Sequence, residues 1–148
     1  MIVAGDETGS PADSPSARVD ANTTTSYFTG VGSVQTTTKR GTYIGTGTVL
    51  TDSDPNNTYV LTAGHVVDIS NNGKLDNADG VTKLTFWFNI GGNQTSSLSV
   101  SGTALSSSVF VNPNYTGFNK PSVNDDLSII RFSGTLPANA LSDRKSVV

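Results

Sequence analysis

The only histidine of the chain, His65, is the side chain best suited to acid–base chemistry. It follows the small residues Ala63 and Gly64, directly after the apolar run Tyr59–Thr62, and is therefore predicted to stand at the end of a β-strand. A side chain there is held by the sheet but is free to face a cleft, and small neighbours let another backbone or a substrate come close. Most lone histidines are surface or hydrogen-bonded polar residues, so the position alone assigns no role.

A second group of chemically capable residues follows His65 directly. The segment Asp68–Asp79 matches the pattern of a Ca²⁺-binding loop, in which oxygen atoms at alternating positions wrap one ion and a glycine permits a sharp turn. The last position holds an aspartate, which is shorter than the usual glutamate and weakens the case for high affinity. A polar loop that binds nothing is the alternative. The predicted ligands of a structural Ca²⁺ are Asp68, Ser70, Asn72, Lys74 (where the motif uses a backbone carbonyl), Asp76 and Asp79.

Composition limits the classes of function. The chain has 148 residues, enough for one domain with its own core and short for two. Its formal net charge is −3, only 14% of its residues are charged and no basic run occurs, so a surface for nucleic acid or an anionic membrane is not expected. No apolar run approaches the roughly 18 residues of a membrane span, and no secretory leader is visible. Cysteine is absent, so the redox compartment cannot be read from it.

The apolar residues occur in short runs separated by Gly, Ser, Thr and Asn, which is typical of strands and turns. A helical turn at 63–67 is expected to carry His65. We predict an all-β fold, an antiparallel Greek-key six-stranded barrel, because closure removes exposed sheet edges. One of its strands is long enough to bend or break at Gly102. The expected strands are Phe28–Thr36, Thr42–Leu50, Tyr59–Leu61, Thr82–Asn89, Leu98–Val111 and Leu127–Phe132.

Three sequence blocks occur in a recognisable order. Gly45–Gly47 precedes a strand, and Val60–His65 reads Val-Leu-Thr-Ala-Gly-His. Further along are Val111–Tyr115, with its Pro-x-Tyr, and Asn124–Ile130, reading Asn-Asp-Asp-Leu-Ser-Ile-Ile. These blocks resemble the segments around the catalytic histidine, ahead of the catalytic aspartate and around that aspartate in trypsin-like (chymotrypsin-fold) serine proteases. The resemblance covers roughly Val31 to Leu136, and it implies the first barrel of the two-barrel trypsin-like fold.

The resemblance implies roles for two residues of a Ser-His-Asp triad: His65 as general base and Asp126 as the carboxylate that orients it. The neighbouring Asp125 is interpreted as a solvent-facing turn acid. The nucleophile should follow in a Gly-Asp-Ser-Gly-Gly motif, but the chain has neither that motif nor a Gly-x-Ser-x-Gly elbow. The family's second barrel, which supplies the serine and the oxyanion hole, has no counterpart here. We therefore expect half of an enzyme, truncated before the second barrel and inactive by itself.

We divide the chain into an extended arm (1–25), the barrel (26–142) and a tail (143–148). The tail can be read as the translation of a common sequencing-adapter sequence, so we interpret it as an artefact of a truncated reading frame; an ordinary C-terminal tail is the alternative. The resemblance implies a secreted, bacterial-type serine endopeptidase whose partners are a protein or peptide substrate and the missing C-terminal barrel. Some family members carry a stabilising Ca²⁺ loop in a comparable place. The alternative is a non-catalytic β-barrel module that binds Ca²⁺ or a protein partner.

Overall fold

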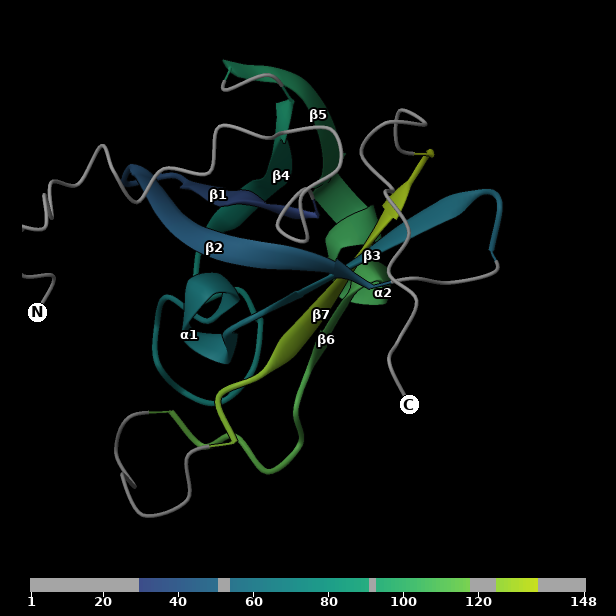
Figure 1. Cartoon of the computed structure of the whole chain (residues 1–148). Coiled ribbons are helices and arrows are strands. Elements are labelled where there is room, and N and C mark those ends of the chain that lie inside the picture. The colour runs from purple at the N-terminus through teal and green to yellow at the C-terminus, as the bar shows by residue number, and fades with distance from the viewer. Residues whose placement is uncertain (1–29, 51–53, 91–92, 118–124, 136–148) are drawn as a thin grey trace, which may run out of the picture.

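The structure is a computed structural model that describes residues 30–50, 54–90, 93–117 and 125–135 (Figure 1). The predicted arm at 1–25 and the predicted tail at 143–148 lie outside the described residues. None of the helices in the described ranges is long or apolar enough to cross a membrane.

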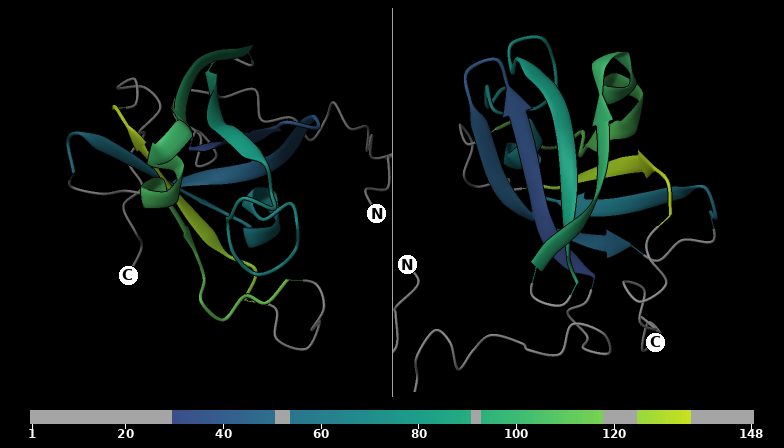
Figure 2. Two further views of the ribbon diagram at one scale, coloured as in Figure 1. Left: turned by 180° about the vertical axis from the view of Figure 1, so that it is seen from behind. Right: turned by 90° about the horizontal axis from the view of Figure 1, so that it is seen from above.

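The described chain is an all-β, antiparallel structure, as predicted. Its strands pair in the order β5-β4-β1-β2-β3-β7-β6 to form a seven-stranded sheet. Figure 2 shows that this sheet is curved and twisted into a half-barrel rather than flat. Two one-turn helices and one 3₁₀ turn interrupt the strands. The elements are β1 (Val31–Thr38), β2 (Thr42–Leu50), β3 (Asn57–Thr62), α1 (Gly64–Val67), β4 (Val81–Ile90), β5 (Asn93–Ser101), η2 (Gly102–Ala104), α2 (Leu105–Ser108), β6 (Val109–Val111) and β7 (Ser128–Ser133).

The core lies on the concave side of the sheet and follows the two-residue period of its strands. Alternate side chains of β3 and β7 are buried, and Val60 is paired with Ile130 across the two strands. Phe86 of β4 stacks on Phe132 of β7 with ring centroids 6.4 Å apart, which joins the two halves of the curved sheet. A Cβ at Gly47 would lie 2.6 Å from Val60 and 2.7 Å from a Val34 methyl group, so β2 needs a glycine where it crosses this core.

The predicted strand Leu98–Val111 breaks at Gly102, where the backbone turns with a φ of +63°. Residues 102–108 form η2 and α2, and the chain resumes as the short strand β6. The part of the chain that the structure describes therefore forms seven strands, where we predicted six. The two edge strands of the sheet, β5 and β6, are consecutive in the chain and are joined by this short connection, which brings the two ends of the sheet towards each other.

Candidate active site at the end of strand β3

His65 and Asp126 meet, although 61 residues separate them in the sequence. The Nδ1 atom of His65 lies 2.7 Å from Asp126 Oδ2, and the backbone N–H of His65 donates to Asp126 Oδ1 at 2.9 Å. A carboxylate beside Nδ1 favours the tautomer that carries its proton there. In that tautomer Nε2 is the ring nitrogen that carries the lone pair.

The helical turn α1 holds His65 in place because three strands contact it or its flanks. The hydroxyl of Thr36 in β1 donates to the Val66 carbonyl at 2.7 Å. A Cβ at Gly45 of β2 would lie 2.6 Å from a Val66 methyl group, so β2 approaches the turn closely only because a glycine stands there. On the other side, the hydroxyl of Ser128 in β7 donates to the carbonyl of Ala63 at 3.2 Å.

Asp126 is positioned by strand pairing. Thr62 of β3 is opposite Ser128 of β7, so the residues that follow β3 and those that precede β7 lie at the same end of the sheet. The backbone carbonyl of Leu127 accepts a hydrogen bond from Asn112 N–H at 2.9 Å. The adjacent Asp125 is partly buried, and its backbone carbonyl accepts the Leu127 N–H at 2.8 Å.

The electrostatics of the pair favour an ionised carboxylate. Partial burial raises the pKa of Asp126, but hydrogen bonds from the ring and N–H of His65 and from the Gly64 N–H outweigh it, so the pKa lies below the usual 3.8. The side chain of Asp126 is 18% exposed and that of His65 is 45% exposed. The carboxylate is therefore shielded while the imidazole faces solvent.

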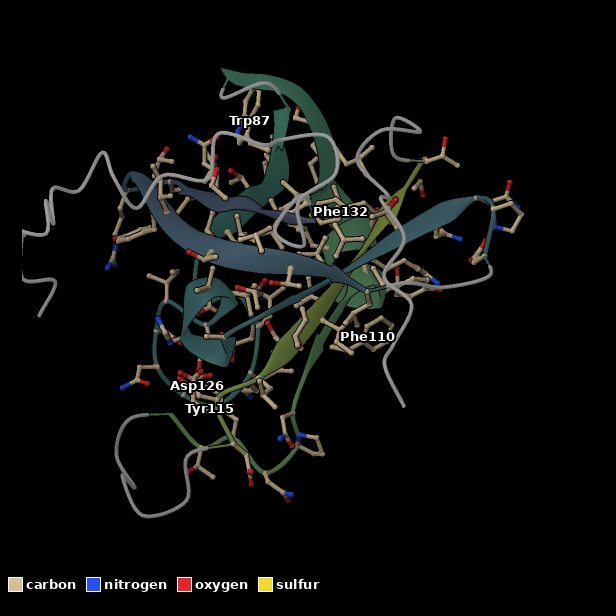
Figure 3. The ribbon with its side chains drawn as sticks, viewed as in Figure 1. Trp87, Phe110, Tyr115, Asp126 and Phe132 are labelled. Atoms are coloured by element: carbon tan, nitrogen blue, oxygen red, sulfur yellow. The ribbon has the colours of Figure 1, made fainter. Side chains whose placement is uncertain are left out.

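Tyr115 lies near Asp126 (Figure 3). A Cβ built at Gly64 would lie 2.9 Å from the Tyr115 ring and 3.0 Å from Asp126 Oδ1, so the turn must carry a glycine here. Burial, followed by the charges of Asp126 and Asp68, raises the pKa of Tyr115 to about 12. The phenol is therefore neutral at any physiological pH, and its hydroxyl donates to Asn71 Oδ1 at 3.3 Å.

The predicted Ca²⁺ loop is closed by its own carboxylates. Asp68 accepts the N–H groups of Asn72 and Gly73 at 3.1 and 2.6 Å. Asp79 accepts those of Ser70 and Asp76 at 2.8 and 2.6 Å. These four bonds join distant parts of the loop backbone.

The fit of the loop to a cation is incomplete. Its oxygen donors suit Ca²⁺, but the Lys74 ammonium lies 3.4 Å from Asp76 Oδ2 and competes for that carboxylate. Within the described ranges, no group of three or more His, Asp or Glu side chains is arranged to hold a metal ion. Calcium binding at these six residues therefore stays a prediction.

The sequence indicated both members of the His65–Asp126 pair but not the residues that support it. Thr36 belongs to no recognised block, and the blocks that contain Gly45 and Ser128 assign neither of them a supporting role. Thr36 and Ser128 are buried polar residues that stand at core-facing positions of their strands. A polar residue in the apolar half of a strand's alternation is the sequence signal that could have marked them. Tyr115 belongs to the Pro-x-Tyr block, and its buried ring lies against the turn that carries His65.

Comparison with known proteins supports the fold alone. No family model matches the chain, and no curated protein matches it. Among solved structures, the chain is similar to the crystal structure of a thermostable serine protease from an extremophilic microorganism, with a TM-score of 0.50 and 14% sequence identity. The similarity covers 72% of this chain but 44% of that one, so the chain spans less than half the length of the structure it matches.

Proposed function

We propose that this chain carries the general-base half of a trypsin-like serine endopeptidase. One observation supports the proposal above all: the hydrogen bond of 2.7 Å between His65 Nδ1 and Asp126 Oδ2, formed across 61 residues of sequence. The orientation, in which a shielded carboxylate faces Nδ1 of a solvent-exposed ring, is what proton transfer to and from a serine requires. The fold likeness to a serine protease is consistent with it.

In the proposed reaction, Nε2 of His65 takes the proton from a serine hydroxyl as that oxygen attacks the peptide carbonyl. The same nitrogen later gives the proton to the leaving amine. Asp126 holds the ring in the correct tautomer and stabilises the imidazolium that forms in between. The substrate would be a protein or peptide in an extracellular setting.

The serine and the oxyanion hole would come from a second barrel that follows in the complete polypeptide. The matched structure extends well beyond the region that this chain covers. In this proposal β5 and β6 correspond to one interrupted strand of a six-stranded Greek-key barrel. The 148-residue chain is then expected to be inactive by itself.

The test is labelling of the complete gene product with a fluorophosphonate, which reacts only with an activated serine. We expect labelling of that product, none of the 148-residue chain, and a fall of about 10⁴-fold or more in the labelling rate with His65→Ala. A second variant, Asp126→Asn, removes the charge of the orienting carboxylate. Its matched control is Asp125→Asn, which removes a charge one residue away. A complete product that labels equally well with His65→Ala contradicts the proposal.

Genomic sequence downstream of the coding region provides an independent check. A Gly-Asp-Ser-Gly-Gly block within the next hundred or so codons supports the enzyme. A genuine stop codon after Val148 would instead favour the non-catalytic β-barrel module and overturn the proposal.

A further inference from the structure

The loop Asp68–Asp79 interlocks with the segment 115–117. A Cβ at Gly73 would lie 2.7 Å from the Tyr115 carbonyl oxygen, and one at Gly117 would collide with the backbone of Asn71. Both glycines have positive φ angles, +91° and +79°, and Asn71 itself has a φ of +60°. The two segments are therefore fitted to each other at backbone level, and neither can move far without the other.

The loop side of this contact is rigid because buried carboxylates organise it. Asp68 and Asp79 are almost fully buried, and each accepts two backbone N–H groups of the loop. Buried carboxylates hydrogen-bonded in this way hold a loop in one conformation, because every alternative leaves a desolvated charge without partners.

The other side of the contact reaches the candidate active site. The ring of Tyr115 fills the space beside Gly64, where Asp126 Oδ1 also lies. Its hydroxyl is tied to the loop through Asn71 Oδ1 at 3.3 Å. One side chain thus reaches the loop at its polar end, while its ring lies at Gly64, the residue that directly precedes His65.

We propose that Tyr115 is a positioning residue that transmits the order of the loop Asp68–Asp79 to the Asp126 carboxylate. The inference rests on the proposed function for its catalytic meaning, but its structural content does not require a serine. Tyr115 acts by packing and by exclusion of water from the carboxylate. Its neutral phenol adds no charge beside Asp126.

The chain's sole histidine allows a direct test by NMR on the 148-residue chain. The Nδ1 proton of His65 exchanges with solvent only when its hydrogen bond to Asp126 opens, so its exchange rate reports how firmly the carboxylate is held. Tyr115→Phe keeps the ring and removes the tie to the loop. Asn71→Gly removes the same tie from the other end and suits the positive φ at that position.

We expect each single substitution to raise the exchange rate about fivefold, the effect of one lost hydrogen bond. The double variant should be no faster than either single variant, because both remove one and the same interaction. The control is Thr58→Val, which removes a hydrogen bond from a buried hydroxyl to the Gly134 carbonyl (2.9 Å) at the far end of β3. It should lower stability and leave the exchange rate unchanged.

Exchange at the wild-type rate in both single variants would overturn the proposal. So would an equal rise in Thr58→Val, because the effect would then be general destabilisation. Failure of fluorophosphonate labelling in the complete product bears on the proposed enzyme alone, so the two failures are distinguishable.

Discussion

Asp126 binds His65 twice, once through the ring and once through the backbone N–H. The second bond fixes where the carboxylate sits, and the first fixes which way the imidazole turns. Two bonds to one residue also explain the direction of the Asp126 pKa, since both favour the charged form against the cost of partial burial. The two hydrogen bonds thus define the geometry of the pair, and the side chains around it hold the turn that carries His65.

The depressed pKa of Asp126 predicts how stability changes with pH. The ionised carboxylate stabilises the fold above about pH 4, and this contribution is lost as the pH falls through the lower folded-state pKa. At pH 7 we expect Asp126→Asn to reduce the free energy of unfolding by about 1–2 kcal/mol. Urea unfolding of both proteins between pH 7 and pH 2 measures the difference, which should shrink below pH 4. Asp125→Asn should leave the profile unchanged, and a constant difference for Asp126→Asn at all pH values would contradict the prediction.

The two residues could be predicted from their sequence blocks, whereas their supports could not. His65 follows one apolar run and Asp126 precedes another, and both runs can be recognised in the sequence. Thr36 matters because its hydroxyl meets the Val66 carbonyl 30 residues away. Gly45 matters because β2 approaches the same residue. Such contacts depend on the path of the chain in three dimensions, so even the block that contains Gly45 does not reveal which residue it meets.

At the scale of the element, the strands followed the sequence where apolar alternation was strong. The structure places β2 at Thr42–Leu50, as predicted, and β4 at Val81–Ile90, one residue longer at each end than expected. β5 begins at Asn93, well before the predicted Leu98, because the polar residues 93–97 pair with β4 in spite of their composition. Hydrogen bonding to an existing strand outweighs propensity there.

The loop Asp68–Asp79 carries a prediction of its own. If it binds Ca²⁺, the ion stabilises the folded state by mass action. A free Ca²⁺ concentration of about 100 times the dissociation constant should raise the melting midpoint by roughly 5–10 °C. Thermal unfolding monitored by circular dichroism, with Ca²⁺ and then with a chelator, measures the shift.

The matched control for the loop is Asp54→Asn. Asp54 organises a different turn, where it accepts Asn56 N–H at 2.9 Å, and its loss should leave any Ca²⁺ response intact. Asp76→Asn should reduce the response. An unchanged midpoint of the wild-type chain at saturating Ca²⁺ removes calcium from the description of this loop and leaves the hydrogen bonds of Asp68 and Asp79 as its support.

At the scale of the whole molecule, the convex side of the half-barrel bears apolar residues that nothing in the described ranges covers fully. Phe110 is 52% exposed and Leu127 is 51% exposed. Phe110 lies opposite Ile129 in the β6–β7 pair, and Ile129 lies opposite Leu61 in the β3–β7 pair. Phe110, Ile129 and Leu61 thus form an apolar row across β6, β7 and β3. An exposed apolar surface of this kind favours association between protein molecules.

We therefore expect the 148-residue chain to self-associate as its concentration rises. The double variant Phe110→Thr and Leu127→Thr should shift the sedimentation profile towards the monomer. Ile44→Thr is the control, because Ile44 is a 74% exposed apolar side chain on β2, away from this row. Sedimentation velocity as a single monomer at every concentration would contradict the expectation.

More of the fold than of the reaction could be predicted from the sequence. Short apolar runs and turn residues indicated an antiparallel β fold, and the curved sheet agrees. The break at Gly102 was indicated by the length of the predicted strand, but the sequence left open whether the strand would bend or divide into β5 and β6. No residue pattern in the chain identifies a nucleophile, so the reaction itself rests on a proposal.

The distance of 61 residues between His65 and Asp126 has a consequence for synthesis on the ribosome. At 5–20 residues per second, the imidazole emerges roughly 3 to 12 seconds before its carboxylate. During that interval nothing selects its tautomer, and the pair assembles only after β7 docks on β3. His65 therefore lacks its orienting carboxylate until the strands around it have paired.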